Sequence, residues 1–303
     1  MIDVRPEVAK ALDLGAAVVA LETTVIAHGL PSPRNLEAAE RMKAAVREEG
    51  AVPAMVAVLR GSVVIGLSAE EVVSLAEGAD VAKATTRDLA VLTASGSAGA
   101  TTVAATAFAA GRAGIAVMAT GGIGGVHRGG ERSMDISADL AQVGRTPVAV
   151  VCSGAKAVLD LPLTLEALET QAVPVVGYGT GSFPAFYARR SGLGLEHRVD
   201  SPEEAARLIA RQRRLGLPGG ILFCNPPPAE SALDPAEVEL LVEAAVRAAE
   251  EKGLRGKEVT PFLLDHLATE SAGRTLTVNL ALLEDNARVA ARIAAAYALF
   301  MNG

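Results

Sequence analysis

Short runs of apolar, largely β-branched residues alternate along this chain with longer amphipathic stretches. The apolar runs predict strands over residues 17–21, 53–59, 62–66, 115–120, 147–152, 174–178 and 220–224. The stretches in which apolar residues recur every three or four positions predict helices over 35–49, 69–77, 101–111, 202–215, 235–252 and 276 to about 300. Because the predicted strands are continuously apolar, both of their faces must be buried. We therefore predict an α/β fold, a three-layer α/β/α sandwich with a mostly parallel central sheet.

Two of the predicted strands, 53–59 and 62–66, are separated only by Arg60 and Gly61, which predicts an antiparallel hairpin. No internal repeat, low-complexity tract or long linker divides the chain. We predict a single domain spanning residues 1–303, with the last helix packed back on it.

Charge and composition exclude several classes of function. The chain has 35 acidic and 28 basic residues, a formal charge of -7, and only six Phe, three Tyr and no Trp. With no cluster of basic residues and few aromatic side chains for base stacking, we predict no nucleic-acid partner. No apolar run approaches the roughly 20 residues of a membrane span, and the N-terminus has no signal-peptide pattern. We predict no membrane association and a cytoplasmic location. Cys152 and Cys224 lie in apolar runs, which predicts buried free thiols.

The segment from Ala119 to Gly130 is rich in candidate chemistry. It follows a predicted strand, and open α/β sheets bind ligands just beyond the carboxyl ends of such strands. Four of the five residues 121–125 are glycine, which allows close backbone approach and positive φ, while His127 and Arg128 add polar donors. The spacing is not a dinucleotide fingerprint, because His127 stands where that fingerprint has glycine or alanine. A tight turn without a ligand is the alternative.

Two further segments could bind charged ligands. Residues 96–103 are small and open a predicted helix, whose N-terminal amides suit a phosphate. They lack the Gly-Lys-Ser/Thr ending of a nucleotide P-loop, and an ordinary threonine N-cap is the alternative. Asp135 and Asp139 are four residues apart and would share one helical face if the segment is helical. Such a pair could hold a hard divalent cation, or could be two solvated acids.

Two charged residues follow predicted strands. Lys156 comes after the 147–152 strand, among small and apolar neighbours, at a predicted strand-to-helix junction. Burial there would lower its pKa and free a nucleophilic amine, although a surface lysine is the alternative. Glu22 ends the first strand, where a lone carboxylate often serves as acid or base. A salt bridge at the sheet edge is the alternative.

Several of these segments together resemble one enzyme family. Residues 20–29 (ALETTVIAHG), the glycine loop 121–130, Asp135–Asp139 and Ser153–Lys156 look like those of the pseudouridine-5'-phosphate glycosidases, also called the indigoidine synthase A family. The resemblance runs from about Val4 to Tyr297 and includes residues 256–264 (GKEVTPFLL). It implies an α/β/α sandwich, a homotrimer and one divalent cation per subunit, usually manganese (Mn2+). It also implies reversible conversion of pseudouridine 5'-phosphate and water into uracil and ribose 5-phosphate.

The resemblance implies roles for individual residues. Lys156 matches the Schiff-base nucleophile, Glu22 the proton donor and Asp135 the metal ligand. Substrate contacts are implied at Lys83, Val103, His127, Ser137, Ala138, Asp139 and Asn279. Thr23 stands where the family more often has serine, and residues 84–86 vary after Lys83. Neither departure puts the chemistry in doubt.

A carbon–carbon glycosidic bond has no heteroatom to protonate, so a pair of carboxylates acting on a leaving oxygen would fail. Opening the ribose ring with acid help from Glu22 and capturing C1 on Lys156 gives an iminium through which the bond can break. Lys83, the Val103 amide and the Ser137 hydroxyl would anchor the phosphate. The alternatives are another Schiff-base lyase or aldolase acting on a sugar phosphate, and a regulatory protein that binds ribose 5-phosphate without turnover.

Overall fold

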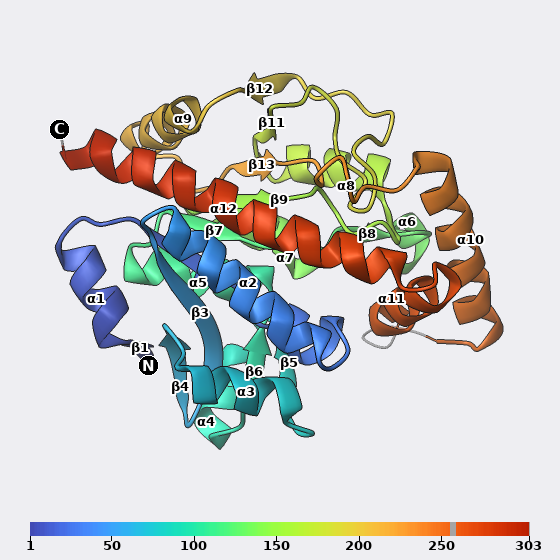
Figure 1. Ribbon diagram of the computed structural model, residues 1–303, viewed down its shortest axis with the longest axis horizontal. Coiled ribbons are helices and arrows are strands. Elements are labelled where there is room, and N and C mark those ends of the chain that lie inside the picture. The colour runs from blue at the N-terminus through green and yellow to red at the C-terminus, as the bar shows by residue number, and fades with distance from the viewer. Residues whose placement is uncertain (255–258, 303) are drawn as a thin grey trace.

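A central β-sheet lies between layers of helices in the computed structural model, which describes residues 1–254 and 259–302 (Figure 1). The strands are β1 (Ile2–Val4), β2 (Val18–Leu21), β3 (Val52–Leu59), β4 (Ser62–Ile65), β5 (Ala82–Ala84), β6 (Gly99–Thr101), β7 (Val117–Ala119), β8 (Val126–His127), β9 (Ala149–Cys152), β10 (Leu159–Asp160), β11 (Val175–Tyr178), β12 (His197–Val199) and β13 (Leu222–Cys224). The helices are α1 (Pro6–Asp13), the π-helix η1 (Val25–Gly29), α2 (Arg34–Glu48), α3 (Ala69–Glu77), α4 (Leu89–Ser95), α5 (Val103–Ala113), α6 (Gly130–Ser133), α7 (Ala138–Val143), α8 (Leu161–Thr170), α9 (Pro202–Arg214), α10 (Pro235–Glu251), α11 (Val259–Glu270) and α12 (Arg274–Asn302).

The main sheet is mostly parallel, as predicted. Among the described residues, β3, β2, β7, β9, β13, β11 and β12 lie side by side in that order and run in one direction. β4 pairs antiparallel with β3 through Arg60 and Gly61, whose φ angles of 49° and 78° fit the left-handed turn that such a hairpin favours. β1, β5 and β6 extend this edge of the sheet. The predicted hairpin is confirmed.

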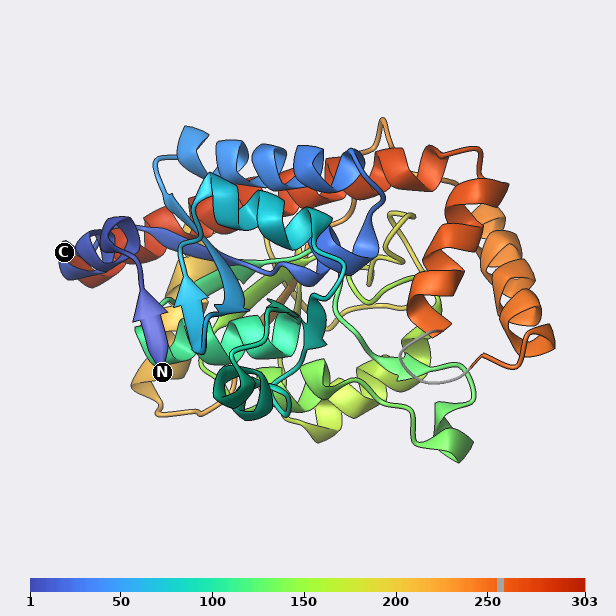
Figure 2. The same ribbon diagram turned by 90° about the horizontal axis from the view of Figure 1, so that it is seen from below.

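Helices cover both faces of the sheet, which confirms the three-layer prediction. α12 lies across β2, β7 and β9, and α2 and α9 pack along it. α5 contacts β2 and β7 from the other face, next to α7. Figure 2 shows α2 and α12 on one side of the sheet and α5 on the opposite side. None of the helices in the described ranges is long and apolar enough to cross a membrane.

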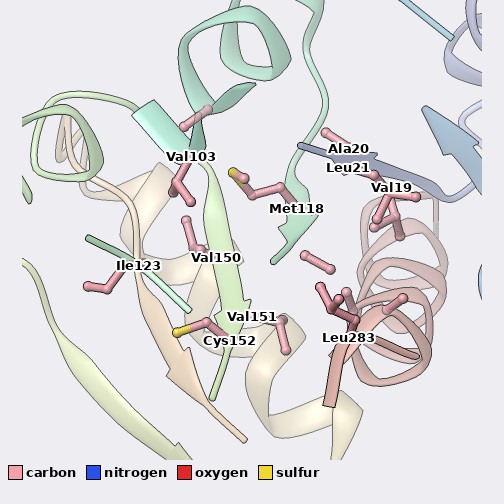
Figure 3. Close-up of a cluster of buried hydrophobic side chains, with 14 of the residues drawn as sticks. Val19, Ala20, Leu21, Val103, Met118, Ile123, Val150, Val151, Cys152 and Leu283 are labelled. Carbon is pink, nitrogen blue, oxygen red and sulfur yellow. The ribbon is translucent and has the colours of Figure 1, made fainter. Parts of the chain in front are cut away.

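The core between the layers is aliphatic and tightly buried. Val19 of β2, Met118 of β7 and Val151 of β9 are all 0% exposed. Figure 3 shows these strand residues with Val103 of α5 and Leu283 of α12. Burial of each large aliphatic side chain stabilises the fold by about 1.5–3 kcal/mol. The strand ends that carry the polar residues described below are therefore held in fixed positions.

The seven strands and six helices predicted from the sequence are all present, with ends that differ by two residues or fewer. Some elements that the pattern missed, such as β1, β5 and β6, have three residues each, too few for a period to show. The helices α1, α8 and α11 were also missed, although they have 8, 10 and 12 residues. Cys152 and Cys224 face each other in register on β9 and β13, and both are buried free thiols, as predicted. Residues 256–258, part of the family resemblance, lie outside the described residues.

Candidate active site

Polar side chains that follow neighbouring parallel strands meet at one edge of the sheet. Glu22 comes directly after β2, Thr120 after β7 and Ser153 after β9, and these strands are adjacent in the order β2, β7, β9. Carboxyl ends of parallel strands are the usual place for a ligand in such a sheet. Two adjoining cavities lie here, and they share Glu22, Thr24, Lys83 and Lys156.

Glu22 is a buried carboxyl group with two hydrogen-bond donors. It is 6% exposed; Val25 N donates to Oε2 at 3.0 Å and Thr120 Oγ1 donates to Oε1 at 3.2 Å. Burial raises the pKa of Glu22 above its ordinary value, and the nearby Lys156 ammonium opposes this rise without reversing it. A carboxyl group that keeps its proton toward neutral pH can serve as a general acid.

Lys156 lies in an extended loop, so the predicted strand-to-helix junction is wrong. Ile123 N donates to Gly154 O at 3.1 Å and Lys156 N donates to Ile123 O at 3.1 Å, which continues the pairing of β7 and β9 beyond the strands. This pairing keeps the chain extended, and α8 begins only at Leu161. The half-buried Lys156 side chain lines both cavities, next to Glu22.

The larger cavity, of about 400 Å³, is suited to an anion. Lys83 of β5, Arg87 and Ser137 line it together with Val103, the first residue of α5. The N-terminus of a helix carries partial positive charge and exposed N–H groups, which bind phosphate well. Thr102 caps α5, accepting from Ala105 N at 3.4 Å, so the ordinary threonine N-cap is present at this helix end. The predicted substrate-contact residues Lys83, Val103, His127, Ser137, Ala138 and Asp139 all line this cavity.

Asp135 and Asp139 do not share a helical face, because the segment that contains both is not helical throughout. Ser137 caps α7, which begins after it, so Asp135 precedes the helix. Asp139 is 6% exposed, and its two carboxylate oxygens accept from Ala104 N and Gly124 N, both at 2.8 Å. Asp139 therefore ties the first turn of α5 to the glycine loop. The half-buried Asp135 lines the larger cavity.

The glycine loop contributes His127 to the site but not Arg128. His127 is half-buried in the wall of the larger cavity. Burial lowers its pKa against the opposing effect of the Asp135 carboxylate, so His127 is neutral near pH 7. Arg128 forms an ion pair with Glu239 of α10 at 2.9 Å. It lines a separate cavity of about 640 Å³, whose lining includes neither Glu22 nor Lys156.

The glycines of this loop are needed for close packing. A Cβ on Gly124 would lie 2.3 Å from Ser137 Oγ, and one on Gly125 would lie 2.3 Å from Thr164 Oγ1. Positive φ occurs later in the loop, at Gly129 (76°), and not within residues 121–125. The predicted close approach of the loop backbone is confirmed, but the neighbours that it approaches are protein side chains. The predicted positive φ within residues 121–125 is wrong.

The smaller cavity, of about 40 Å³, contains two buried polar atoms that lack partners. Asn279 Oδ1 and His28 Nε2 make no hydrogen bond within the described part of the chain, and both residues line this cavity with Phe186. Burial lowers the pKa of His28, which is therefore neutral near pH 7. An unpartnered buried polar group costs about 1–3 kcal/mol. A flat polar ligand placed against Asn279 and His28 would remove this cost.

Sequence reasoning missed several residues of the site. Thr120, which donates to Glu22, ends an apolar run just as Glu22 does, so the same rule could have found it. Thr24, Arg87 and Phe186 line the cavities but stand in no pattern that distinguishes them from surface or core residues.

A buried carboxyl group and a lysine amine line two adjoining cavities at the carboxyl ends of parallel strands, which is the usual position of a ligand site in an α/β protein. The chain belongs to the family of indigoidine synthase A like proteins, whose family model matches residues 7–296. The resemblance inferred from the sequence is confirmed.

Relatives and solved structures agree with this assignment. The chain is 52% identical over 296 residues to the pseudouridine-5'-phosphate glycosidase of Sorangium cellulosum (strain So ce56), covering 97% of this chain and 93% of that protein. It is 51% identical over 293 residues to the enzyme of the same name from Caldanaerobacter subterraneus subsp. tengcongensis, covering 97% and 95%. The structure of the prealnumycin C-glycosynthase AlnA in complex with ribulose 5-phosphate matches with a TM-score of 0.92 and 38% identity, covering 100% of this chain and 98% of that one. An indigoidine synthase A-like protein from Thermotoga maritima matches with a TM-score of 0.87 and 40% identity, covering 97% and 96%.

Replacing Glu22 with glutamine should stabilise the fold at high pH. Folding raises the pKa of Glu22, so the folded state holds this proton more tightly than the unfolded state, and stability falls as pH rises from the unfolded to the folded pKa. Each tenfold difference in proton affinity amounts to about 1.4 kcal/mol. Glu22→Gln should therefore unfold at a higher Tm than the parent at pH 8, with a difference that shrinks toward pH 4, measured by thermal melts.

Glu37→Gln is the matched control for this experiment. Glu37 is a surface carboxylate whose pKa the Arg34 guanidinium lowers, so its replacement should bring no gain at pH 8. A Tm of Glu22→Gln at or below that of the parent at pH 8 would contradict the assigned desolvation.

Asp139→Asn should destabilise the protein far more than Asp135→Asn. The amide group of asparagine would place its own N–H against the backbone N–H of Ala104 or Gly124, so one hydrogen bond to a charged oxygen is lost. Such a bond contributes about 1.5–3 kcal/mol to the free energy of unfolding. Surface changes such as Asp135→Asn usually stay within about 0.5 kcal/mol. Chemical denaturation measures both free energies of unfolding, and equal losses in the two variants would refute the role of Asp139 as a backbone clamp.

Proposed function

We propose that this protein reversibly cleaves the carbon–carbon glycosidic bond of pseudouridine 5'-phosphate, giving uracil and ribose 5-phosphate. The observation that carries the proposal is that Glu22 and Lys156 line two adjoining cavities, one with cationic side chains and a helix N-terminus in its wall and one with the unpartnered Asn279 Oδ1. The names of the relatives from Sorangium and Caldanaerobacter support it, as does the ribulose 5-phosphate bound to AlnA.

Lys156 would act as the nucleophile. As the bond between C1 and the ring oxygen breaks, protonated Glu22 gives its proton to that oxygen and the Lys156 amine bonds to C1. The nitrogen now bonded to C1 is positively charged and gives a proton to the Glu22 carboxylate. Its freed lone pair forms a C=N bond to C1 while the bond between C1 and the base breaks, and Glu22 returns that proton to the base carbon. Water hydrolyses the iminium, which returns the amine and releases ribose 5-phosphate. Loss of such general acid help typically costs ~100- to 10,000-fold in rate.

The phosphate and the base would be bound on opposite sides of this pair. Lys83, Ser137 and the Val103 N–H line the larger cavity, where they would hold the phosphate and orient C1 toward Lys156. In the smaller cavity, Asn279 Oδ1 would accept an N–H of uracil and so gain the partner that it lacks in the described part of the chain. Neutral His127 would contact the opened sugar.

A divalent cation, with manganese implied by the family resemblance, would be held by Asp135. The described residues contain no group of three or more His, Cys, Asp and Glu side chains arranged for a metal. Both carboxylate oxygens of Asp139 accept hydrogen bonds from backbone amides. Asp135 is therefore the member of the pair that could bind an ion which keeps most of its water ligands. When bound, such an ion would supply electrostatic stabilisation next to the substrate.

A different Schiff-base lyase or aldolase acting on a sugar phosphate is the second candidate. The ketose phosphate bound to AlnA, a structural neighbour, favours keeping it. Such an enzyme would use the same lysine but would not release uracil. A homotrimer and a cytoplasmic location stay predictions from the resemblance and the sequence.

The test is turnover of pseudouridine 5'-phosphate together with trapping of the lysine. Purified enzyme with Mn2+ should release uracil and ribose 5-phosphate, measured by chromatography. Borohydride with ribose 5-phosphate should add one sugar-phosphate mass to the peptide that contains Lys156. Lys156→Ala should lose both results, whereas Lys43→Ala on α2 should keep them. Turnover by Lys156→Ala, or labelling of another lysine in active enzyme, would refute the assignment.

Removal of the metal should silence the enzyme reversibly. Treatment with a chelator should abolish turnover and added Mn2+ should restore it, because one carboxylate with water ligands binds an ion weakly and exchangeably. Asp135→Asn should weaken Mn2+ binding about tenfold or more, as expected for loss of a charged ligand worth at least about 1.4 kcal/mol. Glu131→Gln, an exposed acid on neighbouring α6, should bind Mn2+ like the parent. Full activity of metal-free enzyme would exclude the cation.

A further inference from the structure

A fully buried asparagine occupies the middle of α12, where the helix crosses the site end of the parallel strands. Asn286 is 0% exposed and follows, after one helical turn, Leu283, which Figure 3 shows among the core side chains of the sheet. A buried amide in an otherwise apolar helix face must find partners for its donors and acceptor. Asn286 lines neither of the two cavities, so it is not placed to touch a ligand.

The Asn286 amide bonds to the segments that follow three parallel strands. Its Nδ2 donates to Thr120 O at 2.9 Å and lies 3.3 Å from Gly121 O, after β7. It also donates to Ser153 Oγ at 3.1 Å, after β9. Its Oδ1 accepts from Asn225 Nδ2 at 3.0 Å, after β13.

These segments are the ones that hold the acid and the amine. Thr120 donates its hydroxyl to Glu22 at 3.2 Å. Ser153 precedes Lys156 by three residues, and Ser153 N donates to Gly121 O at 2.8 Å. Moving the Thr120 and Ser153 backbones apart would therefore change the separation and the direction of Glu22 and Lys156.

We propose that Asn286 is a positioning residue that fixes the geometry of Glu22 relative to Lys156 by bonding to the backbone after β7 and the hydroxyl after β9. Asn225 supports it from the third strand, and is itself anchored because its Nδ2 donates to Asp285 Oδ2 at 2.7 Å. The inference rests on the proposed function, in which these two groups act on the same sugar carbon. A displacement of about 1 Å in such a pair can cost ~100-fold in rate.

Gln212 provides a matched control, because it is also a buried amide that bonds to backbone carbonyls. Gln212 Nε2 donates to Gly219 O at 2.7 Å and to Gly220 O at 3.1 Å, before the start of β13 and so at the opposite end of that strand from the site. Gln212→Ala and Asn286→Ala both remove amide–carbonyl bonds from the interior. A merely structural role for Asn286 predicts that the two variants behave alike in turnover.

The experiment compares kcat, KM and lysine trapping in the folded variants. Asn286→Ala should lower kcat for pseudouridine 5'-phosphate about 100-fold while KM changes less than about threefold, since the phosphate-binding residues are on other segments. Borohydride trapping of Lys156 with ribose 5-phosphate should slow in parallel. Gln212→Ala should keep the kcat and the trapping rate of the parent.

The outcomes separate this inference from the proposed function. Normal trapping and turnover in Asn286→Ala would overturn the positioning role while leaving the function intact. Absence of trapping and turnover in the parent would overturn the proposed function and this inference with it. Ser153→Ala removes one Asn286 partner with less disturbance, and if Asn286→Ala does not fold, an unchanged kcat in Ser153→Ala would refute the inference.

Discussion

The backbone that leaves β7 and β9 must find hydrogen-bond partners while it is still buried, and the site is built around this constraint. A buried N–H or C=O without a partner costs about as much as a lost hydrogen bond. The two segments satisfy part of this need with each other, through Ile123 and Lys156. Side chains from other elements supply the rest: Asn286 bonds to Thr120 O, and Asp139 accepts from Gly124 N. These bonds hold the strand ends, the glycine loop and Lys156 together as one unit.

Burial also affects which ionisable groups of the site are neutral and which are charged. A carboxyl group that is taken out of water favours its neutral form, and burial accordingly raises the pKa of Glu22. The cations and the helix N-terminus lie around the larger cavity, which remains open enough to receive a phosphate. Both histidines that line the site are neutral near pH 7, since burial lowers the pKa of each. The cationic side chains that line the larger cavity are those of Lys83, Lys156 and Arg87.

The sequence was most informative where a run of residues is long enough to show a period, or where a polar residue ends an apolar run. The parallel strands and the long helices satisfy the first condition, and Glu22 satisfies the second. For residues 135–139 the spacing placed two acids on one face only if the segment was helical. Spacing cannot tell where a helix begins, and Ser137 caps α7 after Asp135. Lys156 was placed at a helix start for the same reason, although its loop stays paired with Ile123.

The sequence by itself determined the α/β architecture and the family, because these depend on local patterns and on several segments in a characteristic order. It also singled out Glu22 and Lys156 as candidates, because each follows an apolar run. Only the tertiary structure decided what those residues face. In the tertiary structure both Asp139 oxygens accept from backbone amides, and Asn279 lines the smaller cavity. Asn286, from near the C-terminal end of the sequence, donates to Thr120 O. Asn286 and Thr120 are separated by 166 positions, and no local pattern encodes a bond over that distance. Such a bond depends on how the layers of the sandwich pack, which fixes distances to fractions of an ångström only once the whole core has formed.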